Sequence, residues 1–157
     1  MSAQAVLTAA KSAGVMIATA ESCTGGMVAV ALTDFPGSSA VVERGFVTYS
    51  NDAKMELLGV RAETLDAHGA VSEEVALEMA DGALRNARVD LTVSITGIAG
   101  PGGSDFKPEG RVCFGIAQTG RPTRVETVEF GAPGRTEVRK SARDHALSLL
   151  LTALQDP

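Results

Sequence analysis

The chain lacks tryptophan and contains one tyrosine and five phenylalanines, so aromatic residues make up only 4% of its 157 residues. The core must therefore be built from alanine, valine, leucine and isoleucine. Hydrophobic residues make up 45% and charged residues 21%, which is the balance of a soluble globular protein. A chain of this length is expected to form one domain, residues 1–157, with a core that needs no disulfide or metal.

Long apolar runs and a basic surface are also missing. No run approaches the roughly 18 apolar residues that a membrane span needs, and the N-terminus does not resemble a signal peptide. We therefore expect a cytoplasmic protein without a membrane partner. The net charge of −5 argues against nucleic-acid binding, which requires a basic face. It leaves a small anionic ligand possible, because a few local amides can bind a phosphate.

Cysteine and histidine are too few and too scattered for a metal site. The two cysteines, Cys23 and Cys113, are expected to be reduced thiols in the cytosol. The two histidines, His68 and His145, have no metal-ligand spacing to each other or to the cysteines. The sequence therefore predicts no structural zinc.

Helical and strand-like segments alternate along the chain. The alternation, with one hairpin near the end, predicts a layered α/β fold with a mixed sheet. Asn51 is expected to cap the third helix, and Ser72 is a candidate cap for the fifth. The expected strands are residues 16–20, 41–49, 91–96, 111–118 and 123–130, and the expected helices are residues 2–13, 27–32, 51–58, 61–67, 73–87 and a final helix that begins near 135.

Two strand ends carry the residues most suited to chemistry, at residues 21–26 and 96–103. Ligands of open α/β sheets bind at the carboxyl ends of strands. The first end places a hydroxyl and a thiol at a helix N-terminus, where amides can stabilise an oxyanion. The turn is similar to a nucleophile elbow, although its residues are not G-x-S-x-G. Taken alone, the segment also fits an ordinary helix cap made by Ser22 or Thr24.

Cys23 competes with Ser22 as a nucleophile, because a helix N-terminus lowers the pKa of a thiol. Neither histidine lies in a recognisable partner motif for it, and a small buried cysteine is common in protein cores. Spacing alone leaves the choice between the two open.

The glycine-rich stretch of residues 97–103 could surround a phosphate, but it is neither a Walker A loop nor G-x-G-x-x-G after a first strand. A flexible connection fits it equally well.

Tyr49 on its own fits a packing role, and Lys54 on its own fits a solvated surface position. A lysine near a serine, however, acts as a general base when burial lowers its pKa. Arg135 begins a four-residue arginine spacing and could reach a phosphate from the helix start.

Several segments together resemble the CinA C-terminal domain family, the nicotinamide-nucleotide amidohydrolases. They occur in the family's order from near residue 16 to the last helix, and in combination they are highly specific. The domain that precedes this one in longer relatives is missing, so the chain resembles the stand-alone form. The matching pieces are TAESCTGG (19–26), GFVTYSN (45–51) with Lys54, HGAVS (68–72), TGIAGPGG (96–103), and Gly134-Arg135 with Arg139.

The resemblance implies a three-layer α/β/α domain with a mixed, mostly parallel sheet that contains one antiparallel hairpin, and a homodimer. It also implies hydrolysis of nicotinamide mononucleotide to nicotinic acid mononucleotide and ammonia, without a metal or cofactor. By position, Ser22 matches the nucleophile, while Tyr49, Lys54 and Thr96 match polar residues around it and Arg135 matches a basic residue of the site.

These correspondences give a working hypothesis. Ser22 attacks the carboxamide, neutral Lys54 takes its proton directly or through Tyr49, and amides at the start of the following helix hold the oxyanion. Thr96 would orient the substrate or the lysine. The residues expected to bind substrate are Glu21, Cys23, Thr24, Gly25, Gly26, Gly97, Gly100, Gly102, Gly103 and Arg135.

The sequence departs from the family pattern at Pro133-Gly134, where an acidic residue is expected next to the glycine. Residues 103–110, which include Lys107, show no interpretable pattern. Two alternatives to the main hypothesis stay open. One is a non-catalytic nucleotide-binding or regulatory module, suggested by the family's competence and DNA-damage label. The other is an amidase for a different small carboxamide.

Overall fold

Two short parallel strands form the centre of the sheet in the computed structural model, which describes residues 2–104 and 106–156. β1 (Ile17–Glu21) is buried along its whole length, and β3 (Leu91–Gly97) is buried as far as Thr96. The two strands pair in parallel, with Glu21 opposite Ile95. Strands covered on both faces are uniformly buried in this way, which explains why both segments lack alternating polarity.

The outer strands make the sheet mixed. β2 (Val42–Val47) pairs in parallel with β1 at one edge. On the other side, β4 (Arg111–Gln118) runs antiparallel to β3, and β5 (Arg124–Glu129) forms the predicted hairpin with β4. The strand order is β2-β1-β3-β4-β5. The predicted strand 41–49 therefore leaves the sheet earlier than expected, after Val47.

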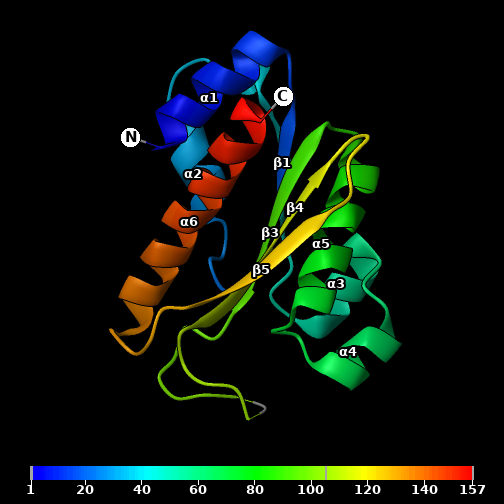
Figure 1. Cartoon of the computed structure of the whole chain (residues 1–157), viewed down its shortest axis with the longest axis vertical. Coiled ribbons are helices and arrows are strands. Elements are labelled where there is room, and N and C mark those ends of the chain that lie inside the picture. Colours follow the sequence, from blue (N-terminus) through cyan, green and yellow to red (C-terminus); the bar gives the residue numbers. More distant parts are fainter. Residues whose placement is uncertain (1, 105, 157) are drawn as a thin grey trace.

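Helices cover both faces of the sheet and confirm the three-layer arrangement (Figure 1). α1 (Ser2–Ala13), α2 (Met27–Thr33) and α6 (Arg135–Gln155) lie on one face, with the single turn η1 (Ser38–Ala40) beyond α2. α3 (Asn51–Leu58), α4 (Ala62–His68) and α5 (Glu73–Ala87) lie on the other. No helix in residues 2–104 and 106–156 is long and apolar enough to span a membrane.

The core is aliphatic, as the scarcity of aromatic residues predicts. The larger hydrophobic cluster lies between the sheet and the face that carries α1 and α6, and includes Val6, Leu91 and Leu150. The second cluster joins β1 to α3 and α5 through Leu58 and Met79. Burying each such side chain contributes about 1.5–3 kcal/mol to folding, so the two clusters fix the layers around the sheet.

Helix capping decides where the site-bearing helices begin. The hydroxyl of Ser72 accepts a hydrogen bond from the Val75 amide at 3.2 Å, which confirms Ser72 as the cap of α5. The predicted cap of α3 was wrong by one residue. Ser50 caps this helix by accepting from the Ala53 amide at 3.0 Å, and Asn51 is the first helical residue. Ser50 has the extended backbone that a capping residue requires, and its hydroxyl lies three residues before the amide.

Candidate active site

The two strand ends singled out in the sequence lie side by side. The amide of Ser22, just after β1, donates to the carbonyl oxygen of Ile95 in β3 at 2.9 Å. Thr96 follows at the end of β3. The chain after β2 joins them, because the Thr48 amide donates to the Glu21 carbonyl at 2.8 Å. Three parallel strands therefore deliver their carboxyl ends to one place, where α/β proteins bind ligands.

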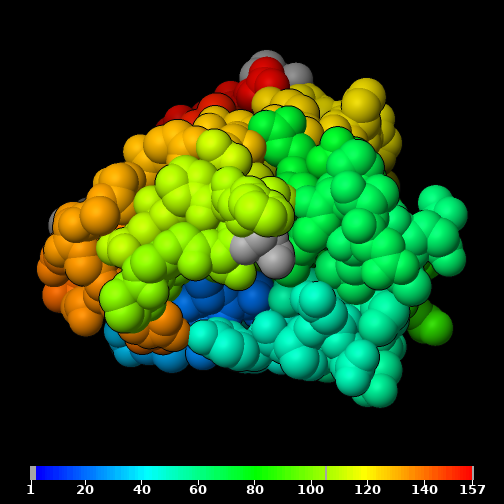
Figure 2. Space-filling model, turned by 90° about the horizontal axis from the view of Figure 1, so that it is seen from below, coloured from blue at the N-terminus to red at the C-terminus, as the bar shows by residue number. Residues whose placement is uncertain are grey.

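A cavity of about 340 Å³ opens at this edge. Seen from below, the blue chain that follows β1 lies at the bottom of a hollow bordered by the yellow-green loop, the orange start of α6 and the cyan start of α3 (Figure 2). Most of the predicted site residues line this cavity: Ser22, Cys23, Tyr49, Lys54, Thr96, Gly97, Gly100, Gly102, Gly103 and Arg135.

Lys54 reaches Ser22 from α3. Its Nζ lies 3.1 Å from Ser22 Oγ, 3.1 Å from the carbonyl oxygen of Thr48 and 3.3 Å from that of Tyr49. Only 1% of the lysine is exposed, and burial lowers its pKa. In the neutral form two N–H bonds can donate to the carbonyls, which leaves the nitrogen lone pair for the Ser22 hydroxyl proton. A lysine amine in this position is within reach to act as a general base for the serine hydroxyl.

Cys23 lines the same cavity but is held as a thiol. It is 5% exposed, and burial raises its pKa to about 12. A free thiol is nucleophilic only as the thiolate, so this environment removes its reactivity at neutral pH. The burial of the thiol therefore favours Ser22 over Cys23 as the nucleophile.

Amides in the first turn of α2 are already hydrogen-bonded within the chain, contrary to the working hypothesis that they hold the oxyanion. The carboxylate of the fully buried Glu21 accepts hydrogen bonds from the Val28 and Ala29 amides, each at 3.0 Å, and from the Thr24 hydroxyl at 2.6 Å. The first-turn amides are thus satisfied by an internal anion, which the helix dipole favours. Glu21 is a helix cap and does not line the cavity.

Three further residues expected to bind substrate, Thr24, Gly25 and Gly26, also lie outside the cavity lining. They form the tight turn between Ser22 and α2. Arg139, on α6, holds this turn from the opposite side by donating from Nε to the carbonyl oxygen of Cys23 at 3.0 Å. The turn therefore shapes the backbone around Ser22 rather than the ligand surface.

Tyr49 and Arg135 meet at the cavity mouth. The Arg135 guanidinium donates to the Tyr49 hydroxyl at 2.9 Å and to the carbonyl oxygen of Gly100 at 2.7 Å. Tyr49 is 62% exposed, and only its backbone carbonyl touches Lys54. The Tyr49 hydroxyl is therefore engaged at the rim, and the direct contact between Lys54 and Ser22 needs no relay.

The cavity is also lined by residues that the sequence did not assign to the site, near the assigned Thr96. The Thr96 hydroxyl, predicted to orient substrate or lysine, donates to the Ala70 carbonyl oxygen at 2.8 Å. Ala70 and Val71, from the α4–α5 connection, line the cavity together with Asn51 and Lys107. The HGAVS motif marked the connection, whereas Lys107 lay in a segment without any recognisable signal.

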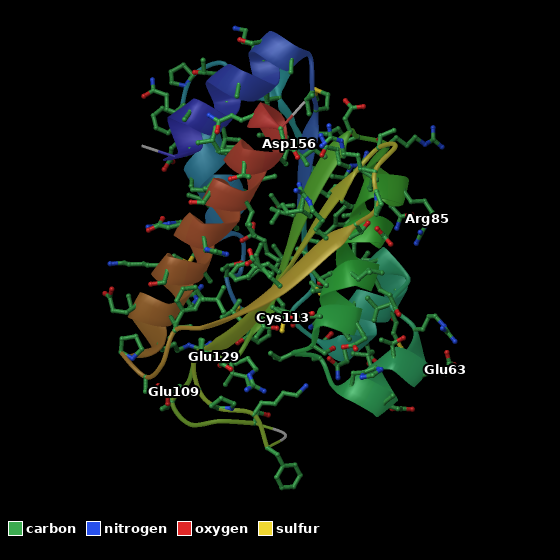
Figure 3. The ribbon with its side chains drawn as sticks, in the orientation of Figure 1. Glu63, Arg85, Glu109, Cys113, Glu129 and Asp156 are labelled. Carbon is green, nitrogen blue, oxygen red and sulfur yellow. The ribbon has the colours of Figure 1, made fainter. Side chains whose placement is uncertain are left out.

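The glycine loop is ordered by a carboxylate as well. The Gly102 amide donates to Glu109 at 2.6 Å, and Glu109 lies at the base of the loop (Figure 3). Gly100 has φ of 91°, a backbone conformation that side chains rarely adopt, and a Cβ there would lie 2.6 Å from the Glu109 carboxyl carbon, so that Glu109 would have to move. The Gly102 amide, which was expected to bind substrate, is thus already hydrogen-bonded to Glu109.

Within residues 2–104 and 106–156, no group of three or more His, Cys, Asp or Glu side chains is arranged to hold a metal ion.

The family model of the CinA C-terminal domain matches residues 1–154. The chain belongs to this family. It is 55% identical to "Nicotinamide-nucleotide amidohydrolase PncC" of Escherichia coli (strain K12) over 143 residues, which cover 90% of this chain and 86% of that protein. It is 61% identical to a "CinA-like protein" of Chloroherpeton thalassium over 112 residues, or 71% of this chain and 27% of that protein.

The fold is shared with solved structures of the family. The crystal structure of competence/damage inducible protein CihA from Agrobacterium tumefaciens superposes with a TM-score of 0.94 at 48% identity. The match covers 99% of this chain and 94% of that one. A structure of the competence damage-inducible protein A from Klebsiella pneumoniae gives a TM-score of 0.94 at 38% identity.

Proposed function

We propose that this chain hydrolyses the carboxamide of nicotinamide mononucleotide to nicotinic acid mononucleotide and ammonia, through an acyl-enzyme on Ser22. The observation that carries the proposal is the contact between Lys54 Nζ and Ser22 Oγ at 3.1 Å in a cavity at the sheet edge. The name of the Escherichia coli relative, a nicotinamide-nucleotide amidohydrolase at 55% identity, supplies the substrate class. The role would be recycling of pyridine nucleotides in the cytoplasm.

In the first half-reaction, neutral Lys54 takes the Ser22 hydroxyl proton while Oγ forms a bond to the carboxamide carbon. The tetrahedral intermediate then collapses as the C–N bond breaks. Lys54 returns its proton to the departing nitrogen, which leaves as ammonia. Burial of Lys54 serves this cycle, because a lowered pKa makes the neutral base available nearer to neutral pH.

The oxyanion needs a donor other than the first turn of α2, whose amides bind Glu21. We assign this role to the amide of Cys23, the residue directly after the nucleophile. Cys23 lines the cavity, and its amide donates to no other residue in the described part of the chain. The amide after the nucleophile fills the same role in other strand–turn–helix hydrolase sites.

In the second half-reaction, water attacks the acyl carbon. Lys54 accepts a proton from that water and returns it to Ser22 Oγ as the ester bond breaks, so the carboxylic acid leaves and the enzyme is restored. The substrate phosphate would pair with Arg135, whose guanidinium lies at the mouth of the cavity. Thr96 and Gly97 would contact the body of the nucleotide.

The test is incubation of the purified, metal-stripped protein with nicotinamide mononucleotide, measuring ammonia and nicotinic acid mononucleotide. Ser22→Ala should abolish turnover, while Ser12→Ala, on the exposed side of α1, should not change it. Added hydroxylamine should divert the acyl-enzyme to a hydroxamate in the wild type alone.

The result separates the alternatives. A folded wild type without turnover would move the proposal to another small carboxamide or to a binding role. Turnover without hydroxamate would favour direct attack by water. A sizing column gives the oligomeric state, for which we propose a homodimer.

A further inference from the structure

Part of the wall of the cavity that contains Ser22 and Lys54 is a short connection between two helices. α4 ends at His68, and Gly69 follows with φ of 77° and donates its amide to the Leu65 carbonyl oxygen. At the other end, Ser72 caps α5 and also donates its hydroxyl to the Gly69 carbonyl oxygen at 2.9 Å. Both ends of the connection are therefore fixed by their helices. Ala70 and Val71, between them, line the cavity.

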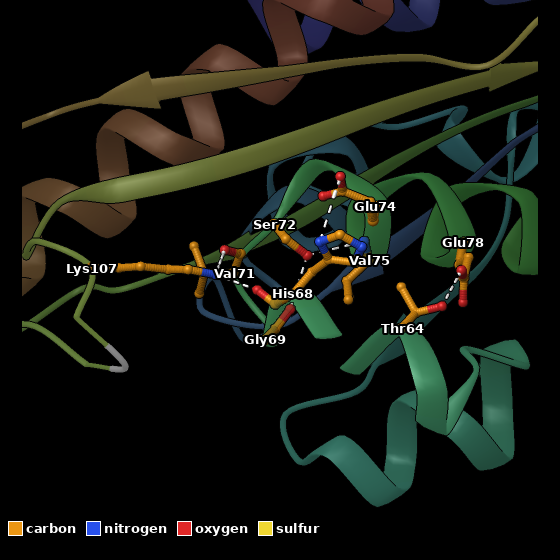
Figure 4. Close-up of polar contacts among 9 residues, drawn as sticks. All are labelled: Thr64, His68, Gly69, Val71, Ser72, Glu74, Val75, Glu78 and Lys107. Carbon is orange, nitrogen blue, oxygen red and sulfur yellow. Dashed lines mark hydrogen bonds and ion pairs between the residues drawn. The ribbon is translucent and has the colours of Figure 1, made fainter. Parts of the chain in front are cut away.

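Lys107, which also lines the cavity, holds this connection through its side chain. Its side chain extends from the glycine loop to the α4–α5 connection (Figure 4). Nζ donates to the carbonyl oxygens of His68 and Val71, each at 2.5 Å. These are charge-assisted hydrogen bonds, which are about twice as strong as neutral ones. The stretch that no sequence pattern explained thus fastens one wall of the site.

The position of Lys107 is itself determined by the loop. The Lys107 amide donates to the Ser104 carbonyl at 2.8 Å, and the Ser104 amide donates back to the Lys107 carbonyl at 3.0 Å. Thr96 provides a second attachment through Ala70 from the end of β3. The connection is held on one side by the central sheet and on the other by the loop, and no other side chain in the described residues binds its Ala70 or Val71 carbonyls.

We infer that Lys107 is a positioning residue for the substrate: it fixes Ala70 and Val71 as the wall against which the nucleotide is bound. Lys107 does not contact Ser22 or Lys54, so its loss should leave the chemical step intact. The kinetic part of this inference rests on the proposed function. Its structural part, that the ammonium orders the connection, does not.

The experiment compares Lys107→Met, which keeps the stem and removes the charge, with Lys140→Met. Lys140 is exposed on α6 and loses the same charge outside the site. Hydrogen–deuterium exchange of the peptide spanning residues 68–73 should become faster in Lys107→Met only. With nicotinamide mononucleotide, KM should rise about tenfold with kcat within twofold of the wild type, because the ordered wall binds the substrate and the transition state equally. Lys107→Arg, which keeps charged donors, should restore part of the loss.

Each other outcome overturns a part of the inference. A raised KM with unchanged exchange would mean that the Lys107 ammonium touches the substrate itself. Faster exchange with unchanged KM would mean that the connection does not hold the substrate. A fall in kcat with unchanged KM would place Lys107 in the chemical step. An inactive wild type would refute the proposed function, while the exchange result would still decide whether Lys107 orders the wall.

Discussion

Lys54 Nζ and Ser22 Oγ lie 3.1 Å apart, and the same nitrogen lies within 3.3 Å of two backbone carbonyl oxygens. The lysine enters from α3, on one face of the sheet, and the serine follows a central strand. Three acceptors suit an ammonium, and two acceptors plus a hydroxyl donor suit a neutral amine equally well. The site therefore accepts both protonation states of Lys54, as a group that moves a proton must.

The first prediction concerns the pH dependence of the rate. Burial lowers the pKa of Lys54 below its ordinary value of 10.5, and only the neutral amine can accept the serine proton. We expect kcat/KM to rise with pH and then to level off. The midpoint of the rise should lie below pH 10.5. Initial rates between pH 5 and 10 check this. A rate that falls over the range, with the protein folded, would remove Lys54 as the base.

The second prediction concerns how the free energy of unfolding depends on pH. The pKa of Lys54 is lower in the folded protein than in the unfolded chain. At any pH between these two pKa values, the folded protein therefore binds fewer protons than the unfolded chain. The wild type should therefore gain stability relative to Lys54→Met as pH rises toward 10.5, and the cost of burying the charge should be fully present below the folded pKa. Urea unfolding of both proteins at several pH values gives the difference. A difference that does not change with pH would show that Lys54 is not desolvated.

The sequence predicted the layers, the hairpin and most of the residues around the cavity, for a physical reason. β1 and β3 are short uninterrupted apolar runs, and parallel strands that are buried on both faces need that composition. Their carboxyl ends then meet at one edge, which placed Ser22 near Thr96 before any geometry was known. Tyr49 and Lys54 were assigned to the site from the family resemblance. Their spacing alone fitted a packing role for the tyrosine and a solvated position for the lysine equally well.

The roles of Glu21 and Lys107 could not be predicted from the sequence, because they depend on the direction in which each side chain points. Glu21, next to Ser22, was expected at the substrate, yet its carboxylate turns to the amides of Val28 and Ala29. Nothing in a linear pattern distinguishes a carboxylate that caps a helix from one that binds a ligand. Lys107 was missed because its acceptors are backbone carbonyls, which leave no signature in the residues that carry them.

The third prediction separates the two nucleophile candidates. Because burial raises the pKa of Cys23 to about 12, roughly one thiol in ten thousand is ionised at pH 8. Cys23→Ala should therefore keep kcat within a few-fold of the wild type, and the wild type should resist iodoacetamide at pH 8. Loss of activity in Cys23→Ala together with full activity in Ser22→Ala would reverse the assignment.

The fourth prediction concerns Arg139, which holds the turn after Ser22. Its Nε donates to the Cys23 carbonyl oxygen at 3.0 Å. Arg139→Met should lower kcat about tenfold and stability by about 1.5 kcal/mol, because a charge-assisted hydrogen bond to the nucleophile turn is lost. The matched control is Arg143→Met, one turn along α6, where the arginine pairs, among the described residues, with its neighbour Asp144 alone. Equal losses in both variants would show a general effect of charge on α6.

The last prediction tests how closely α3 and α5 pack. Gly82 lies in the middle of α5, where alanine ordinarily stabilises a helix by about 1 kcal/mol. Here a Cβ would lie 1.9 Å from the Leu58 carbonyl oxygen at the end of α3, which is closer than any real contact. Gly82→Ala should instead destabilise the protein by about 2–3 kcal/mol, because the two helices must move apart.

That displacement should also reach the active site, because α3 carries Lys54. We expect Gly82→Ala to lose activity even at temperatures where circular dichroism shows it folded. Arg85→Ala, at an exposed position of the same helix, should change stability by less than about 0.5 kcal/mol and leave the rate unchanged. A Gly82→Ala variant as stable and as active as the wild type would mean that α3 has room to shift without moving its lysine.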